Sequence, residues 1–270
     1  MKNKQIQIGR WLSAIILSAI IGSAAIAQTD IEKTRKAAEQ GSATAQYSLG
    51  LAYWHGEGVD KDQRVAVRWI RKSAEQGNAD AQFDMGAAYA TGMGVEKDKS
   101  ESAWWFRKAA EQGNAGAQFN LGVAYARGLG VDKNESAAVE WYRKAAEQGN
   151  AGAQFTFGKA YANGTGVNKN EQAAAWWYRK AAEQGHAAAQ FLLGSAYGWG
   201  EGVERDQSKG VEWTRKVAEQ GIAAAQIAMG FAYRWGMGVD KSELMATHWY
   251  GKAAELGHAA AQKALDEMGY

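Results

Sequence analysis

The tetrapeptide AEQG returns every 36 residues along this chain of 270 residues. A constant internal period of about 20–50 residues predicts stacked supersecondary units that each pack against their neighbours. The six copies and a variant, AELG, begin at Ala38, Ala74, Ala110, Ala146, Ala182, Ala218 and Ala254. The period defines full units at residues 43–78, 79–114, 115–150, 151–186, 187–222 and 223–258. A half unit at 28–42 precedes them, and a capping half unit at 259–270 follows.

Each unit has the sequence features of two helices joined by a glycine turn. In the first unit, Ala45, Leu49 and Ala52 recur at helical spacing and predict a helix over residues 43–55. The segment GEGV at 56–59 predicts a chain reversal, because glycine readily adopts positive φ where a helix ends. A phosphate-binding loop is the alternative. It is disfavoured because no third glycine and no Lys-Ser/Thr pair follow at the required spacing.

The second helix of each unit follows a residue that favours the helix N-cap. These residues are Asp62, Asp98, Asn134, Asn170, Asp206 and Ser242. One tryptophan per second helix predicts a buried wedge between helices: Trp69, Trp105, Trp141, Trp177, Trp213 and Trp249. A glycine inside each first helix, such as Gly50, costs about 1 kcal/mol relative to alanine and predicts the close approach of another helix. Together these features predict an all-α fold, a right-handed α/α superhelical solenoid of 36-residue two-helix repeats.

The first 27 residues differ from the repeats. Basic residues precede an apolar run at 11–27 that ends in Ala-Ile-Ala, a small-residue cleavage signal. This pattern predicts a secretory signal peptide cleaved after Ala27, and hence a periplasmic or secreted protein. An uncleaved anchor is the alternative, although 17 apolar residues are marginal for spanning a bilayer.

Composition narrows the expected partners. The chain has 31 basic and 29 acidic residues, so loss of the three basic residues in the leader, Lys2, Lys4 and Arg10, leaves a net charge of −1. This charge gives no electrostatic reason to bind nucleic acid or an anionic membrane. The absence of cysteine excludes disulfides, thiolate metal sites and a bacterial lipoprotein anchor. We expect a monomer that binds a protein or peptide, with no nucleic-acid partner and no membrane association after cleavage.

The repeated pattern resembles the Sel-one-like repeat family, a relative of the tetratricopeptide solenoids. It reads A-x-A-Q-x-x-L-G-x-A-Y-x-x-G-x-G-V, then D/N-x-x-x-A-x-x-W-x-x-K-A-A-E-Q-G, and it covers residues 43–258. The resemblance implies an adaptor that holds other proteins, as in bacterial envelopes. One bacterial branch of the family carries paired cysteines and has been linked to β-lactam binding or hydrolysis. That activity is the alternative function, although this chain has none of those cysteines.

The sequence contains no converging set of catalytic residues. The four histidines, His55, His186, His248 and His258, are scattered over the repeats and are not arranged to bind one metal or activate one nucleophile. The S-x-x-K, S-D-N and K-T-G motifs of serine β-lactamases are also missing. We therefore predict that the protein is not an enzyme and uses no cofactor or metal.

Three positions of each first helix vary between units while lying on one helix face. Residues equal in every unit build the stack, so the varying positions are free to specify a partner. In unit order they are Ser48-Leu51-His55, Asp84-Ala87-Thr91, Asn120-Val123-Arg127, Thr156-Lys159-Asn163, Leu192-Ser195-Trp199 and Ala228-Phe231-Trp235. The stripe becomes apolar and aromatic toward its C-terminal end, as a binding site requires. A solvated face without a partner is the alternative.

The predicted function is an exported repeat scaffold that binds another protein or peptide on its concave face, as an adaptor or regulator of an envelope complex. The predicted binding residues are Leu192, Trp199, Phe231, Trp235, Arg127, Lys159, Asn163 and His55. The first four form the apolar centre, and the polar residues orient the partner. The sequence leaves open whether Trp104 and Trp176 form a second contact surface.

Overall fold

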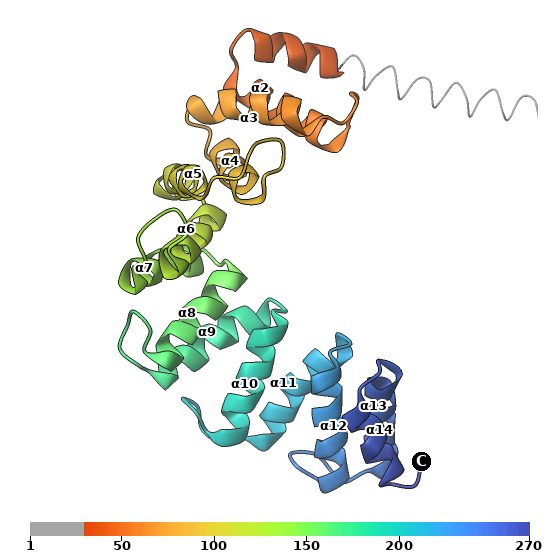
Figure 1. Ribbon diagram of the computed structural model, residues 1–270. Coiled ribbons are helices and arrows are strands. Elements are labelled where there is room, and N and C mark those ends of the chain that lie inside the picture. The colour runs from red at the N-terminus through yellow and green to blue at the C-terminus, as the bar shows by residue number, and fades with distance from the viewer. Residues whose placement is uncertain (1–29) are drawn as a thin grey trace, which may run out of the picture. The chain divides into compact units, whose positions relative to one another are not determined.

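The computed structural model describes residues 30–270, and these residues fold as two compact units of packed helices (Figure 1). One unit extends to Ala117 and includes Leu129–Val131, and the other comprises Gln118–Gly128 and Asp132–Tyr270. We call them the N-terminal unit and the C-terminal unit. The predicted signal peptide, residues 1–27, lies outside the described residues.

Helices follow one another in pairs with the predicted 36-residue period. In the N-terminal unit, a helix at residues 30–39 is followed by α2 (Ala43–His55), α3 (Gln63–Glu75), α4 (Ala79–Thr91) and α5 (Lys99–Glu111). The next helix, α6 (Ala115–Arg127), lies mostly in the C-terminal unit. That unit continues with α7 (Glu135–Glu147), α8 (Ala151–Asn163), α9 (Glu171–Glu183), α10 (Ala187–Trp199), α11 (Gln207–Glu219), α12 (Ala223–Trp235), α13 (Glu243–Glu255) and α14 (Ala259–Asp266). No strand occurs within residues 30–270, and within each unit consecutive helices pack together, from α2 to α5 and from α7 to α14, so the predicted all-α solenoid is confirmed. None of the helices in this range combines the length and apolar character needed to cross a membrane.

The predicted caps fix where the helices begin and end. Asp62 accepts hydrogen bonds from the backbone N–H groups of Arg64 and Val65, at 2.9 and 3.0 Å, and the other five predicted caps act in the same way. The first helices end at glycines in the left-handed conformation, as Gly56 does at φ 81°. The glycine turn is therefore a helix stop, as its sequence predicts.

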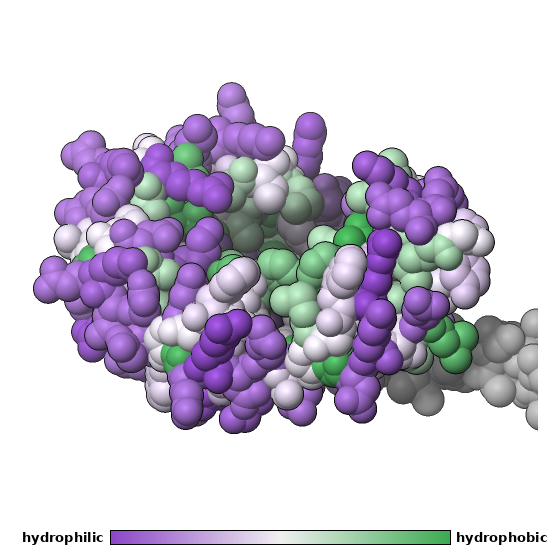
Figure 2. Space-filling model, turned by 90° about the horizontal axis from the view of Figure 1, so that it is seen from below, coloured by the Kyte–Doolittle hydropathy of each residue, from purple (hydrophilic) through white to green (hydrophobic). Residues whose placement is uncertain are grey.

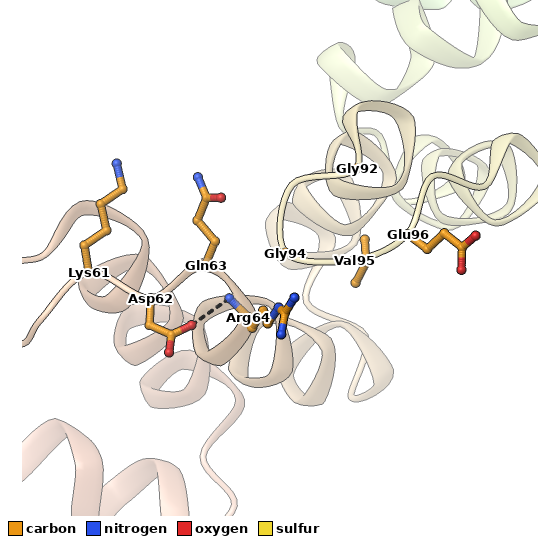
Figure 3. Close-up of a pocket in the computed structure, with 8 residues that line it drawn as sticks. All are labelled: Lys61, Asp62, Gln63, Arg64, Gly92, Gly94, Val95 and Glu96. Atoms are coloured by element: carbon orange, nitrogen blue, oxygen red, sulfur yellow. Dashed lines mark hydrogen bonds between the residues drawn. The ribbon is translucent and has the colours of Figure 1, made fainter.

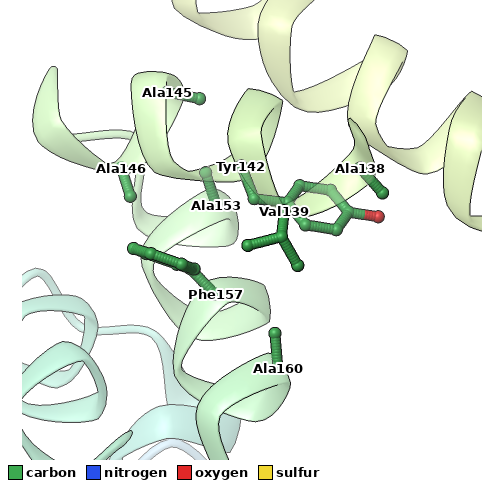
Figure 4. Packing of buried hydrophobic residues seen from close by; sticks show 8 residues of the cluster. All are labelled: Ala138, Val139, Tyr142, Ala145, Ala146, Ala153, Phe157 and Ala160. Carbon is green, nitrogen blue, oxygen red and sulfur yellow. The ribbon is translucent and has the colours of Figure 1, made fainter. Parts of the chain in front are cut away.

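The glycines inside the first helices mark close helix contacts. A Cβ atom added to Gly158 would lie 2.8 Å from the ring of Tyr178 and 3.2 Å from the carbonyl oxygen of Ala174. Real Cβ atoms do not come so close, so only glycine fits, and the predicted close approach is confirmed. Figure 4 shows how one repeat packs on the next, where Tyr142 of α7 lies with Phe157 of α8 in one buried cluster.

The tryptophan wedges are less uniform than predicted. Trp105 and Trp249 are each only 4% exposed, whereas the other four are half-buried. Trp141 is one of these four, so its predicted full burial is wrong. The ammonium group of Lys144 lies over the Trp141 ring, 4.2 Å from its centroid.

Pairs of glutamines, one buried and one exposed, explain why one junction sequence is repeated so closely. Gln184 donates from Nε2 to Oε1 of Gln154 at 2.7 Å, and Gln154 donates from its own Nε2 to the carbonyl oxygen of Ala146 at 3.1 Å. The same side-chain bond joins Gln76 to Gln46, Gln112 to Gln82, Gln148 to Gln118 and Gln220 to Gln190. The first glutamine of each pair is buried, and a buried amide must be hydrogen-bonded, so the exposed second glutamine is constrained as its donor.

Candidate binding groove

The first helices of two neighbouring repeats and the second helix between them enclose a pocket, and this pocket recurs at the same repeat positions. In the C-terminal unit we call these pockets the α7–α8, α9–α10 and α11–α12 pockets, with volumes of about 180, 310 and 280 Å³. Lys159 and Asn163 line both of the first two, and Ser195 lines both of the last two. The three pockets are therefore adjacent along this unit, and we call the row that they form the groove. In the space-filling view, apolar residues lie in hollows between ridges of hydrophilic side chains (Figure 2).

Most of the predicted binding residues line this groove. Leu192 lines the α9–α10 pocket together with Lys159 and Asn163. Trp199 and Phe231 line the α11–α12 pocket. Two others lie elsewhere in the C-terminal unit: Arg127 ends α6, and the Trp235 ring, outside the pocket lining, has its centroid 6.3 Å from that of Phe231. His55 lines a separate pocket of the N-terminal unit.

The α11–α12 pocket exists because the fifth repeat has small residues where other repeats have large ones. Thr214 occupies the position held elsewhere by Ile70, Phe106, Tyr142, Tyr178 and Tyr250. Gly198 also stands where every other repeat has a larger residue. Gly210 does so too, but a Cβ atom there would lie 2.9 Å from the carbonyl oxygen of Gly194, so Gly210 permits close helix contact and does not open the pocket. A Cβ atom added to Gly198 would meet no atom within 4 Å, so this wall of the pocket is open space.

The loss of the large ring at Thr214 leaves Phe191 exposed. In the two preceding repeats, Phe119 lies 5.8 Å from Tyr142 and Phe155 lies 6.0 Å from Tyr178, measured between ring centroids. Phe191 has no such ring partner at Thr214 and is 40% exposed. Sequence reasoning missed Phe191 because phenylalanine is regular at this position. The signal lay in the broken pattern at Thr214.

Four large apolar side chains therefore surround one pocket. Phe191, Trp199, Phe231 and Met237 line it, with exposed fractions of 40%, 75%, 49% and 41%. Single exposed apolar residues are common on proteins, but a contiguous group around a hollow is typical of a binding site.

The groove carries a cation that has no carboxylate partner within residues 30–270. This is Lys159, whose ammonium lies 5.8 Å from the Phe155 ring centroid. Arg127, at the end of α6 and outside the pocket linings, also forms no ion pair within these residues. In contrast, the rim carboxylates Glu135 and Glu171 are each paired with a lysine at 2.8 Å. Glu201 adds one further carboxylate to the α9–α10 pocket. The Arg127 charge also offsets part of the rise that burial causes in the pKa of Tyr142.

A further hollow of the N-terminal unit arises from the docking of two turns. It lies between successive turns and is lined by Lys61, Asp62, Gln63, Arg64, Gly92, Gly94, Val95 and Glu96 (Figure 3). Asp62 is engaged there as a helix cap. A Cβ atom on Gly94 would lie 2.4 Å from the carbonyl oxygen of Gln63, so the two turns are in backbone contact. The residues of this hollow therefore serve to dock one turn on the next.

Two exposed tryptophans stand outside the groove. Trp104 of α5 and Trp176 of α9 are 48% and 50% exposed, and each contacts the next tryptophan of its own helix in an edge-on arrangement at 4.5 Å. A lysine ammonium lies over each ring, at 5.4 and 5.3 Å. Neither residue lines a pocket described above.

The histidines serve separate local roles. His186 accepts a hydrogen bond at Nδ1 from the backbone N–H of Ala189 and stacks on Phe155, with ring centroids 4.6 Å apart. His248 lies edge-on to Trp249. Within residues 30–270, no three His, Asp or Glu residues are grouped as metal ligands would be.

Comparison with known proteins identifies the repeat. The family model described as Sel1 repeat matches residues 43–78, 79–114, 115–150, 151–186, 187–222 and 223–258. The boundaries are those predicted from the sequence period.

Two solved structures are similar to the chain over most of its length. One is c5321, a protective antigen present in uropathogenic Escherichia coli strains displaying an SLR fold; it is 38% identical, with a TM-score of 0.83. The match covers 86% of this chain and 50% of c5321, so the chain spans half the length of that protein. The other is a Sel1 repeat protein from Oxalobacter formigenes, 35% identical with a TM-score of 0.76, matched over 87% of this chain and 68% of that one. No match is found among the curated proteins.

Proposed function

The chain belongs to the Sel1 repeat family, whose repeats generally mediate protein interactions, and we propose that its groove binds an extended segment of another protein. In this proposal the α11–α12 pocket holds an apolar anchor of the segment. Lys159 and Arg127 face its acidic residues. The protein acts as an adaptor or regulator of an envelope complex, exported by the leader at residues 1–27.

The observation that carries this proposal is the exposed apolar group around the α11–α12 pocket. Binding energy in protein interfaces is concentrated in a few aromatic and apolar residues that enclose a pocket. Phe191, Trp199 and Phe231 provide such residues, while Thr214 and Gly198 provide the space between them. A folded chain that needed only internal packing would gain stability by filling this space, as the neighbouring repeats do.

The period of the groove indicates the spacing of the segment. Neighbouring packed helices are about 10 Å apart, and an extended chain advances about 3.3 Å per residue. One repeat therefore corresponds to about three residues of the bound segment. Lys159 lines the two pockets before the α11–α12 pocket, so we expect an acidic residue about three to six positions from the apolar anchor.

A peptide-display selection against residues 28–270 tests the proposal with defined probes. We expect selected peptides to share one aromatic or leucine anchor with an acidic residue about three to six positions away, and to compete with each other for one site. Two variants locate that site. Thr214→Tyr fills the pocket with the residue found in the third, fourth and sixth repeats, and Trp199→Ala removes one wall.

Each groove variant is expected to weaken peptide binding by about a factor of ten to one hundred or more, the range for hot-spot residues. The matched control is Trp176→Ala, which removes an equally large exposed indole outside the groove and leaves binding unchanged. Selected peptides that bind Thr214→Tyr as tightly as the wild type would place the site elsewhere and overturn the proposal.

A further inference from the structure

The N-terminal unit contains a second pocket of different chemistry, enclosed by α2, α3 and α4. Its volume is about 250 Å³, below the about 300–1,000 Å³ of small-molecule sites, so it has room for one side chain. Leu51, Trp54, Val67, Ile70, Met85 and Met93 supply most of its lining. We call it the α3–α4 pocket. It occupies the same repeat positions as the pockets of the groove, but one polar group makes it different.

That polar group is the carboxylate of Asp84. The side chain is half-buried, and the hydroxyl of Tyr47 donates to its Oδ2 at 2.8 Å. A carboxylate offers about four acceptor sites, and no other hydrogen bond or ion pair reaches this one from residues 30–270. Burial accordingly raises the pKa of Asp84 above its usual value. A half-buried carboxylate with a single donor is under-satisfied, because desolvation of the charge is only partly compensated.

The charges around the pocket favour a cation. Asp80 lies one helical turn before Asp84 on α4, forms no ion pair within the described residues, and accepts a hydrogen bond from Asn114 at 3.1 Å. Its negative charge acts on both Asp84 and Tyr47. His55 also lines the pocket, and its charge lowers the pKa of Asp84, against the larger effect of burial. The wall of Trp54 adds an aromatic face, which also attracts cations.

We propose that the α3–α4 pocket binds one long cationic side chain, a lysine or an arginine, of a partner protein. The apolar lining contacts the aliphatic stem of that side chain, and the free oxygen of Asp84 accepts hydrogen bonds from its charged head. Lysine and arginine are suited to this arrangement because they bury their stems on apolar surfaces while the head remains in a polar site. Tyr47 holds the carboxylate in place during binding. The site is independent of the groove in the C-terminal unit.

The test uses four blocked pentapeptides that differ at their central residue: arginine, lysine, norleucine or glutamine, with glycine and alanine elsewhere. Binding to residues 28–270 is followed by NMR, through the shift of the Trp54 indole N–H. We expect the arginine and lysine peptides to produce a saturable shift at concentrations about tenfold lower than norleucine, which matches the stem but has no charge. Glutamine, polar and uncharged, is expected to be weakest.

Asp84→Asn tests the role of the charge. Asparagine stands at the equivalent position of the next repeat as Asn120, so the fold accepts it, and its amide oxygen still accepts from Tyr47. We expect this variant to abolish the tenfold preference for arginine and lysine over norleucine. The matched control is Asp80→Asn, which removes a charge of the same helix outside the pocket lining and keeps most of the preference.

Two results would overturn the proposal. One is norleucine binding as well as or better than arginine, which would make the pocket a purely apolar site. The other is a preference for arginine that survives in Asp84→Asn, which would assign the cation to another group. Neither result bears on the groove, whose probes and variants lie in the other unit.

Discussion

Leu256 stands at the repeat position from which a glutamine should donate to Gln226, and the buried Oε1 of Gln226 consequently has no hydrogen-bond donor within residues 30–270. In the fifth repeat the same bond is made by Gln220, which donates to Gln190 at 2.8 Å. The Leu256 side chain is 58% exposed, so its apolar atoms gain little in exchange. The variant tetrapeptide AELG is thus a defect in the glutamine pairs of the sixth repeat.

Leu256→Gln should repair this defect. The new side chain can donate to the Gln226 Oε1, and satisfying a buried acceptor contributes about 1 kcal/mol to the free energy of unfolding. Chemical denaturation of the wild type and the variant measures the gain. Leu256→Met is the control, since it has similar size and no donor and should leave stability unchanged. Equal midpoints for wild type and Leu256→Gln would mean that water already satisfies the amide.

The fold could be predicted from the sequence because the same helix-capping, helix-ending and packing residues recur in all six repeats. Asp62 and its equivalents start the second helices, Gly56 and its equivalents stop the first helices, and Gly158 and its equivalents permit close packing. Each of these residues acts within one repeat or between neighbouring repeats. A period without insertions then fixes the register of the whole stack.

The site was harder to predict because it depends on what a repeat lacks. The varying stripe on the first helices identified Trp199 and Phe231 by their residue type. The pocket between them arises from Thr214 on α11, a residue with no chemical signature of its own. Phe191 is exposed because it lacks the ring contact that Phe155 makes with Tyr178, and only the packed structure reveals this. In the same way, sequence alone did not separate fully buried wedge tryptophans from half-buried ones.

The wedge tryptophans should therefore differ in their contribution to stability. Trp105 is 4% exposed and packs in the cluster that includes Met85, so Trp105→Ala should cost about 3–5 kcal/mol, as for other buried aromatic residues. Trp141 is half-buried, so Trp141→Ala should cost roughly half as much. Denaturation of both variants measures the difference. Trp104→Ala, at an exposed ring beside Trp105, is the control and should change stability by no more than about 0.5 kcal/mol.

Alkaline pH should weaken the C-terminal unit through Tyr178. Burial raises the pKa of this phenol from 10.0 to about 12. A folded-state pKa above the unfolded value means that the neutral form stabilises the fold. This contribution is complete below pH 10 and is lost as the pH rises from 10 toward about 12.

Tyr178→Phe isolates this effect. Phe106 stands at the equivalent position of the second repeat, so the fold accepts phenylalanine there. Denaturation at about pH 8 and about pH 11 should show a larger loss of stability for the wild type than for the variant. The comparison subtracts the titration of lysines and of the other tyrosines, which both proteins share. Identical losses would show that Tyr178 ionises as freely in the folded state as in the unfolded chain.

Thr214→Tyr should make the fifth repeat pack like its neighbours without disturbing the fold. The carbonyl oxygen of Gly210 would lie 3.0 Å from a Cβ atom on Gly194, close to the 3.2 Å between Ala174 and Gly158 in the preceding repeat, where Tyr178 is accommodated. The new ring should contact Phe191 as Tyr178 contacts Phe155, at a centroid distance of about 6 Å. Filling a pocket of about 280 Å³ with buried aromatic surface should leave the melting temperature unchanged or raise it by a few degrees.

Calorimetry measures this shift, and NMR contacts between the ring of residue 214 and Phe191 report the packing. Thr214→Val is the matched control, because it keeps the size of threonine and leaves the pocket open. A melting temperature well below that of the control would show that the helices of this repeat have no room for the ring, and that the pocket is a product of backbone geometry as well as of side-chain size.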